Sequence, residues 1–482
     1  QVNFKRLLAE QNVDELIKAE SSLAEYDFFL RESKDQASFL LTPDLEELIA
    51  RLDIYGVGAW ANLFNQLTST ASEEMGEEKK SLTELRNLAH SPDQDVRRKA
   101  YQAELALYPK IEKSLASALS SIKGQVIYLS KRRGHDSPLD EALFKSRMSR
   151  PTLDAMIEAM IEKKNIFARY YLAKAKHLGQ ERLHWADMFA PLGKLPSGYS
   201  VDESRALLVS SFENFHPPIA ELIDKAYRDK WIDFYPRDKK VGGAFCSNLA
   251  FIKQSRVLTN FDGSFSAVDT LAHELGHAYH GYRIEDHAPL NRSYSMPVAE
   301  TASTFNETHF LLEQIGASHK AEEKLGLLDS FLMNSSQTIC DILSRFLFEQ
   351  QVFERVATED LRSEDLQAIM HEAQLEAYGD GLDENSLHPY MWACKSHYYS
   401  ASRSYYNFPY AFGALFAALL YEKAQARGPA FMKQYDEMLT ATTVSSVEEI
   451  GDLLGLDLRT KETWMKSMES FKPFVDEFEK LI

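Results

Sequence analysis

The chain has 482 residues, enough to bury a large core and, by length alone, to form two or three domains. Its hydrophobic content of 44% and charged content of 26% are typical of a soluble globular protein. The formal net charge of −18 argues against a phosphate-binding surface, so we expect no nucleic-acid partner. The three cysteines are odd in number and lack CxxC spacing, which argues against a disulfide framework and favours the reducing cytoplasm.

Most of the chain has the apolar spacing of amphipathic helices. Segments 93–107 and 152–178 each carry apolar residues three and four positions apart among many charges. The longest apolar run, at 410–421, has 12 residues, whereas a membrane-spanning helix needs about 20. We therefore expect no membrane span, and no signal peptide or internal repeat is visible.

The segment 242–261 departs from the helical pattern. Residues 244–246 and 256–260 have the pattern of short strands around a turn, and a second turn signal follows at 260–264. We therefore expect a small β-sheet immediately before the next helix.

Residues 273–277 read HELGH, an HExxH motif, within a segment, 266–282, that has helical apolar spacing. Residues i and i+4 share a helix face, so His273 and His277 can both direct an imidazole nitrogen at one metal ion. Glu274 lies one position round the helix, where its carboxylate can reach a water without binding the metal. Two nitrogen ligands beside a carboxylate base are the arrangement of a zinc hydrolase, although an ordinary helix surface can carry the same letters.

A third ligand is needed to complete such a site. His280 lies about 10 Å along the helix axis from His273, too far for one ion, so we interpret it as a core or supporting residue. Segment 298–307 is expected to form a second helix with Glu300 and Glu307 on one stripe. Glu300 would complete a His–His–Glu set with one open position, the catalytic form of zinc site. Glu307 can hold a ligand imidazole in one tautomer, and both glutamates can equally belong to a solvated helix face.

The segment 397–410 is rich in neutral hydrogen-bond donors. Its candidates are His397, Tyr398, Tyr399, Tyr405, Tyr406 and Tyr410. Tyrosine hydroxyls donate hydrogen bonds while staying neutral at pH 7, which suits them to the oxyanion of a tetrahedral intermediate. Aromatic clusters also form core packing, and we interpret Tyr398, Tyr399 and Tyr405 in that way.

Several blocks of sequence carry a family resemblance. They are WID at 231–233 with GGAFC at 242–246, TLAHELGHA at 270–278, AETASTF at 299–305, HYY at 397–399 and YYNFPYAFG at 405–413. From about residue 20 to its C-terminus the chain resembles the thimet-oligopeptidase-like zinc peptidases, and within them the bacterial oligoendopeptidase F branch. Several unrelated blocks in the same order are more specific than HExxH alone.

The resemblance implies both a site and a fold. The implied site has one zinc ion per chain, with His273, His277 and Glu300 as ligands, Glu274 as general base and acid, and His397, Tyr406 and Tyr410 as oxyanion donors. The implied fold is mainly α, with two helical lobes around a deep substrate channel and a small β-sheet beside the zinc helix. We expect residues 1–75 to be the remnant of an N-terminal helical domain and residues 76–482 to be the helical zinc-peptidase catalytic domain. Family members usually carry a further segment ahead of the point where this chain begins, and that segment would help to form the channel entrance.

The predicted function is that of a cytoplasmic zinc metalloendopeptidase that hydrolyses short oligopeptides, with no nucleic-acid or membrane partner. The strand near Val257 is expected to hold the peptide by edge pairing. One alternative is a dipeptidyl carboxypeptidase of the same wider family, and another is a helical peptide-binding protein with a vestigial metal site. The sequence predicts no particular oligomeric state.

Overall fold

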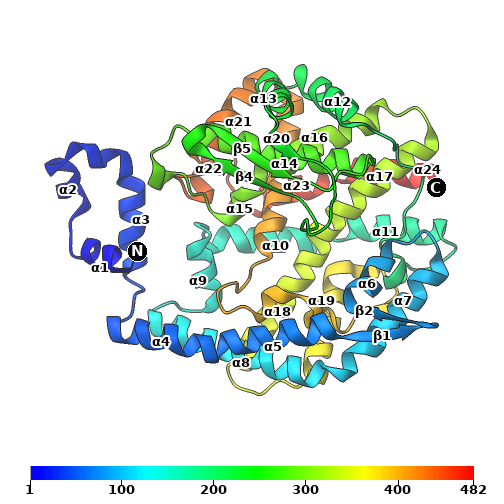
Figure 1. Cartoon of the computed structure of the whole chain (residues 1–482), viewed down its shortest axis with the longest axis horizontal. Coiled ribbons are helices and arrows are strands. Elements are labelled where there is room, and N and C mark those ends of the chain that lie inside the picture. The colour runs from blue at the N-terminus through cyan, green and yellow to red at the C-terminus, as the bar shows by residue number, and fades with distance from the viewer. Residues whose placement is uncertain (1) are drawn as a thin grey trace.

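The computed structural model describes residues 2–482, which fold mainly into α-helices with two small sheets (Figure 1). The predicted mainly α class is therefore confirmed. Among these residues no helix combines the length and the apolar character that crossing a membrane requires.

The first half of the described chain is a succession of helices of moderate length. They are α1 (Val2–Ala9), α2 (Val13–Ala19), α3 (Asp27–Ala37), α4 (Pro43–Tyr55), α5 (Val57–Thr70), α6 (Leu82–Asn87), α7 (Gln94–Leu107), α8 (Glu112–Arg133), α9 (Pro138–Lys145), α10 (Arg150–Lys163), α11 (Asn165–His177), α12 (Val201–Glu213) and α13 (Pro217–Arg228). The predicted segment 93–107 is α7, which begins after Asp93 because that side chain accepts hydrogen bonds from two orphan backbone amides. Segment 152–178 is interrupted at Lys164 and forms α10 and α11.

The second half contains the HExxH helix and the C-terminal bundle. Its helices are α14 (Phe265–Ile284), α15 (Met296–Ala299), α16 (Thr301–Ala317), α17 (Ala321–Ser336), α18 (Ile342–Val356), α19 (Ser363–Tyr378), α20 (Phe408–Arg427), α21 (Pro429–Ala441), α22 (Val447–Leu453), α23 (Lys461–Glu469) and α24 (Lys472–Leu481). A π-helical turn, η7 (Gln337–Asp341), joins α17 to α18, and a 3-10 helix, η11 (Ser396–Tyr399), precedes α20.

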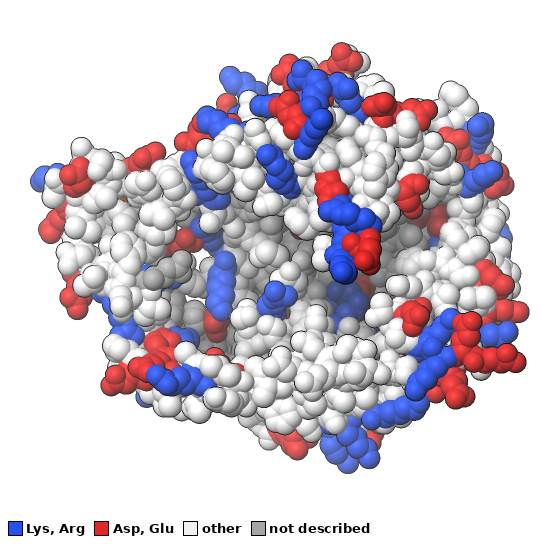
Figure 2. All heavy atoms as spheres, viewed as in Figure 1, with Lys and Arg blue, Asp and Glu red and all other residues white. Residues whose placement is uncertain are grey.

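The helices lie in two groups with a hollow between them. Figure 1 shows α12 to α16 with α20 to α23 in one group, and α4 to α9 with α18 and α19 in the other. Figure 2 shows the same face of the molecule, hollowed between the two groups. Helices α1 to α3 stand to one side, and they have a small core of their own built from Leu8, Val13 and Leu30.

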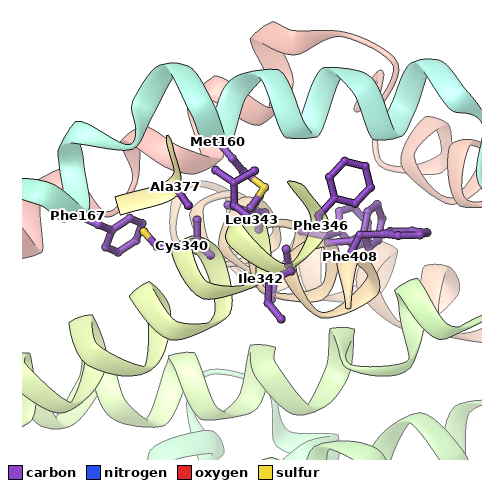
Figure 3. Close-up of a cluster of buried hydrophobic side chains, with 14 of the residues drawn as sticks. Met160, Phe167, Cys340, Ile342, Leu343, Phe346, Ala377 and Phe408 are labelled. Carbon is purple, nitrogen blue, oxygen red and sulfur yellow. The ribbon is translucent and has the colours of Figure 1, made fainter. Parts of the chain in front are cut away.

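One core continues through both groups. Figure 3 shows part of it, with Met160 of α10, Phe167 of α11, Phe346 of α18 and Phe408 of α20 among the buried side chains. Burying a side chain of this size stabilises the fold by about 1.5–3 kcal/mol. Because α20 is anchored in this core at Phe408, the residues on either side of Phe408 have fixed positions relative to α14 and α16.

Two small sheets accompany the helices. A hairpin of β1 (Ser72–Met75) and β2 (Glu78–Ser81) was not predicted. The second sheet has the order β3-β5-β4, with β3 (Ile232–Asp233) parallel to β5 (Gln254–Leu258) and β4 (Phe245–Leu249) antiparallel to it. This sheet is the predicted one, and it lies beside the HExxH helix, where an Asn248 side-chain amide donates to the His277 carbonyl oxygen.

The structure corrects the strand proposed for edge pairing. Val257 lies on β5, the middle strand, and its amide already donates to the Trp231 carbonyl oxygen. Its side chain is 2% exposed. Within residues 2–482, β4 pairs with a neighbouring strand on one side only, so the edge of this sheet beside α14 belongs to β4 instead.

Helices α14 and α16 approach each other more closely than a side chain would allow. A Cβ added at Gly276, inside the HExxH motif, would lie 2.5 Å from the Ala302 carbonyl oxygen and 2.6 Å from the Ser303 Cα. A second close approach lies between α20 and the residue that precedes α16, because a Cβ at Gly413 would lie 3.0 Å from the Glu300 Cβ. Glycine at these two positions therefore sets how near the three helical segments come.

We expect Gly276→Ala to destabilise the protein by roughly 1–3 kcal/mol, because the new methyl group meets backbone atoms that cannot move aside cheaply. Gly316→Ala is the matched control, since Gly316 lies on α16 with open space around it and alanine is the better helix former. The midpoint of thermal unfolding measures both changes. Equal midpoints for the two variants would contradict the steric role of Gly276.

Candidate metal centre

Three donor atoms from two separate segments converge beside α14. The His273 Nε2 and the His277 Nε2 each lie 3.3 Å from the Glu300 Oε2. All three donor atoms lie within 4.8 Å of one another. The two histidines come from successive turns of α14, and Glu300 comes from the junction between α15 and α16.

The donor set fits a zinc ion. Two ligand atoms of a tetrahedral site with bonds of about 2.1 Å lie about 3.4 Å apart, and the two imidazole-to-carboxylate distances of 3.3 Å have this length. Two imidazole nitrogens with one carboxylate oxygen leave a fourth position open, as in catalytic zinc sites. The residues that the sequence singled out as ligands, His273, His277 and Glu300, are therefore brought together in a suitable geometry.

From the sequence we expected Glu300 to lie within one continuous helix over 298–307. In the structure the helix is interrupted at Glu300. Helix α15 ends at Ala299, α16 begins at Thr301, and Glu300 itself has φ −91° and ψ 1°. The break turns the Glu300 side chain toward the two histidines. The Ser303 hydroxyl, one turn further, lies 2.9 Å from the Glu300 Oε2 and donates to it, which fixes the carboxylate in that direction.

Glu307 contacts one of the two candidate ligand histidines. Its Oε2 lies 2.9 Å from the His273 Nδ1, so the Nδ1–H donates to the carboxylate and the lone pair of the imidazole is left on Nε2. This is the tautomer that a metal ligand needs. His280, which we interpreted as a core or supporting residue, is fully buried, stacks on Tyr294 and hydrogen-bonds Thr442 through its Nε2.

Glu274 is a buried carboxylate beside the donors. Its side chain is 6% exposed, and its Oε2 has no hydrogen-bond partner among residues 2–482. Burial raises the pKa of Glu274 above its ordinary value. On the β4 side its neighbour is Cys246, whose thiol pKa is raised to about 12 by burial and then by the Glu274 charge, so that thiol stays protonated. An oxygen without a partner at this position is free to accept a proton from a water molecule.

Tyr410 lines the same cavity as the donors. This cavity has a volume of about 260 Å³, and His273, Glu300, Glu307 and Tyr410 are among the residues around it. The Tyr406 hydroxyl lies 2.8 Å from the Tyr410 hydroxyl, so the two tyrosines form a hydrogen-bonded pair at the cavity wall.

His397 stands behind that pair. Its ring centroid lies 6.2 Å from that of Tyr406, and no interaction among residues 2–482 joins it directly to the three donors. Burial, followed by the charges of Arg345 and Lys123, lowers the pKa of His397 to about 2. The imidazole is therefore neutral at pH 7, and its Nε2 has no partner among the described residues.

A turn with an unusual backbone conformation immediately precedes Tyr406, whose hydroxyl contacts that of Tyr410. Tyr405 has φ 53°, in the left-handed region that a bulky residue rarely adopts. Its ring is 5% exposed and stacks on Phe353 with centroids 5.3 Å apart, so packing holds the unusual backbone in place. Tyr398 and Tyr399 are also buried, at 0% and 1% exposure.

Part of the cavity wall is polar and was not predicted from the sequence. Asn334 and Ser335 at the end of α17, together with Thr338 of the π-helical turn η7, line it. The signal was the run NSSQT at 334–338 inside an otherwise apolar helical segment. π-helical turns occur frequently at functional sites.

Comparison with known proteins identifies similar chains. Residues 87–470 match the family described as Peptidase family M3, and residues 7–71 match the one described as Oligopeptidase F. Oligopeptidase PepF of Bacillus subtilis is 23% identical over 489 residues, which cover 98% of this chain and 72% of that relative. A solved candidate peptidase from Chlamydophila abortus has a TM-score of 0.88 at 23% identity, covering 99% of this chain and 81% of that one. Oligoendopeptidase-F from Enterococcus faecium has a TM-score of 0.76 at 19% identity, covering 99% and 82%.

We expect Glu300→Ala to abolish tight zinc binding, because a donor atom is lost, whereas Glu307→Ala weakens zinc affinity only by about 10–100-fold, because only the orientation of His273 is lost. Glu313→Ala, an exposed carboxylate on the same helix, serves as the matched control. Zinc content after dialysis against graded chelator measures all three. Equal retention in Glu300→Ala and Glu313→Ala would exclude Glu300 as a ligand.

Proposed function

Because the chain belongs to peptidase family M3, we propose that it is a cytoplasmic zinc metalloendopeptidase that hydrolyses short oligopeptides. The observation that best supports a metal-dependent peptidase is the convergence of His273, His277 and Glu300, with both imidazole nitrogens 3.3 Å from one carboxylate oxygen. A buried carboxylate, that of Glu274, lies beside them.

Glu274 is the proposed general base and acid. Zinc held by the three ligands would act as a Lewis acid and lower the pKa of a bound water to about 7. The partnerless Oε2 of Glu274 accepts the proton of the attacking water and then delivers it to the nitrogen of the leaving amine. Burial favours the protonated carboxyl and so makes Glu274 a stronger base for the first transfer, the removal of the proton from water.

Tyr410, Tyr406 and His397 are the proposed donors to the oxyanion. Two hydroxyls 2.8 Å apart share one hydrogen bond, so one proton of the Tyr406–Tyr410 pair stays free to point into the cavity. With Tyr406 donating to Tyr410, the free proton is that of Tyr410, which lines the cavity. Neutral His397 packs behind Tyr406 and can donate through one ring N–H.

The free edge of β4 is the proposed support for the peptide backbone. Cys246 on this strand neighbours Glu274, so an extended peptide paired with β4 would pass close to the proposed base. Main-chain hydrogen bonds to a strand edge recognise any sequence, which predicts a loose preference for side chains.

The activity is tested by digestion of a mixed library of short peptides with zinc-loaded protein, followed by mass spectrometry of the products. Internal cuts at several positions support an endopeptidase. Release of C-terminal dipeptides alone would assign the chain to the dipeptidyl carboxypeptidases instead. The absence of cleavage by protein that retains zinc would overturn the proposed activity.

We expect Glu274→Gln to bind zinc as the parent does but to lose about 10²–10⁴ in kcat, because the three ligands remain while the base is gone. Steady-state hydrolysis of an internally quenched peptide measures the loss, and metal analysis of the same sample checks the zinc. Near-parental turnover in the zinc-loaded variant would remove Glu274 from the mechanism.

Tyr410→Phe and Tyr406→Phe are expected to lower kcat by about 10²–10³ with a smaller change in KM, because an oxyanion donor acts mainly in the transition state. Tyr399→Phe is the control from the same segment, since its hydroxyl is buried, has no hydrogen-bond partner among residues 2–482 and does not belong to a residue that lines the cavity. If Tyr410→Phe and Tyr406→Phe both keep the parental kcat, the two tyrosines serve only in packing, and His397 is the remaining proposed donor.

A further inference from the structure

Arg403 is an exposed cation without a carboxylate partner beside the proposed oxyanion donors. It lies in the turn that leads to Tyr406, where its backbone amide donates to the Ser400 carbonyl oxygen. Its guanidinium carbon lies 5.3 Å from the centroid of the Tyr406 ring, a cation–π contact. Among residues 2–482, no carboxylate lies within 4.0 Å of this guanidinium, and no side-chain hydrogen bond from it is formed.

Two of the other three cations around His397 are paired with carboxylates. Lys123 pairs with Glu349 at 2.5 Å in full burial, and Arg345 pairs with Asp341. Lys395 faces a small cavity that Asp341 also lines. Arg403 differs from Lys123 and Arg345, because no carboxylate among residues 2–482 pairs with it, and it differs from Lys395 because its side chain is exposed.

The charge of Arg403 is felt at the proposed catalytic groups. It is one of four cations that, after burial, lower the pKa of His397. Burial raises the pKa of Tyr410, and the charge of Arg403 opposes that rise. A cation that acts on both residues lies near the place where the substrate would bind, since Tyr410 lines the cavity of the metal donors. Figure 2 shows that Lys and Arg side chains are exposed within the hollow of this face.

We propose that Arg403 is a specificity-determining residue that binds a carboxylate of the peptide substrate; this rests on the proposed peptidase function. The Tyr406 ring holds the guanidinium plane by the cation–π contact, and the planar fork offers two parallel N–H donors to one carboxylate. The carboxylate is either an Asp or Glu side chain of the peptide or its terminal α-carboxylate, and both present the same pair of oxygens.

The position of Arg403 limits where that carboxylate stands in the peptide. The guanidinium contacts the ring of Tyr406, and the hydroxyl of Tyr406 is hydrogen-bonded to that of Tyr410. Two contacts therefore separate Arg403 from the Tyr410 hydroxyl. An extended peptide advances about 3.3 Å per residue, so the bound carboxylate belongs about two to four residues from the scissile bond. Peptides with a carboxylate at this distance are the preferred substrates.

The test compares matched peptides on matched variants. An internally quenched peptide is made with Glu or Gln at each position in turn, and with a free or an amidated C-terminus. The ratio of kcat/KM for each acidic peptide to its neutral partner is measured for the parent, Arg403→Gln, Arg403→Lys and the control Arg459→Gln, whose guanidinium pairs with Asp452 and Asp457 far along the chain.

We expect the parent and Arg459→Gln to prefer one acidic peptide about tenfold, the size of a charge-assisted hydrogen bond. In Arg403→Gln this ratio falls to about one, mainly through KM, and in Arg403→Lys it is intermediate because charge remains without the fork. The position that responds, Glu side chain or free C-terminus, identifies the source of the carboxylate. A ratio in Arg403→Gln equal to that of the parent, or a parent ratio of about one for every pair, overturns the proposal.

Binding separates this proposal from the proposed peptidase activity. Fluorescence anisotropy of the same peptides, labelled, is measured on proteins that all carry Glu274→Gln to stop turnover. One outcome is that the acidic peptide binds preferentially, that Arg403→Gln abolishes this preference, and that the protein with Glu274 intact cleaves no peptide. This outcome would contradict the peptidase assignment alone. Equal binding of acidic and neutral peptides by a protein that does cleave peptides would sink the Arg403 assignment alone.

Discussion

The close approach of α14 to α16 is the constraint on which the candidate site depends. Two histidines of α14 lie 3.3 Å from the carboxylate that immediately precedes α16, and Gly276 allows the backbones of the two helices to come close at the same place. Gly413 lets α20 close on Glu300 from the other side. The same helix α20 begins near the tyrosine pair, so one packing arrangement fixes both the donor atoms and the opposite cavity wall.

The sequence predicted the features of the fold that depend on local spacing. Apolar residues three and four positions apart are sufficient for helices such as α7, and an alternating pattern between turns is sufficient for β4 and β5. It did not predict that the helices are interrupted at Lys164 and Glu300, because each interruption depends on tertiary packing rather than on the local amino-acid sequence. The edge strand was misassigned for the same reason: β3 has only two residues, yet its pairing makes β5 the middle strand.

The candidate site divides along the same line. The pair His273 and His277 follows from helix periodicity alone, and Glu274 from its place between them. The third donor required a family resemblance, because the chain between His277 and Glu300 carries no spacing rule. The arrangement of Tyr406 depends on the left-handed backbone of Tyr405, which no sequence pattern indicates. Arg403 was not singled out because an exposed arginine cannot be distinguished by sequence from any other solvated charge. The chemical roles of these residues stay predictions.

The π-helical turn η7 joins α17 and α18 end to end, and it determines how the side chains of α18 are rotated about the helix axis relative to those of α17. An α-helix rotates by about 100° per residue, and a π-turn accommodates one residue more than an α-turn does. Asn334 and Ser335, ahead of η7, line the metal-donor cavity, whereas Asp341 at the end of η7 pairs with Arg345 of α18, whose charge acts on His397. Deletion of a single residue within 337–341 would rotate the side chains of α18 relative to those of α17 without substituting any residue in either helix. The number of residues in this turn therefore matters to the arrangement of the site as much as their identity does.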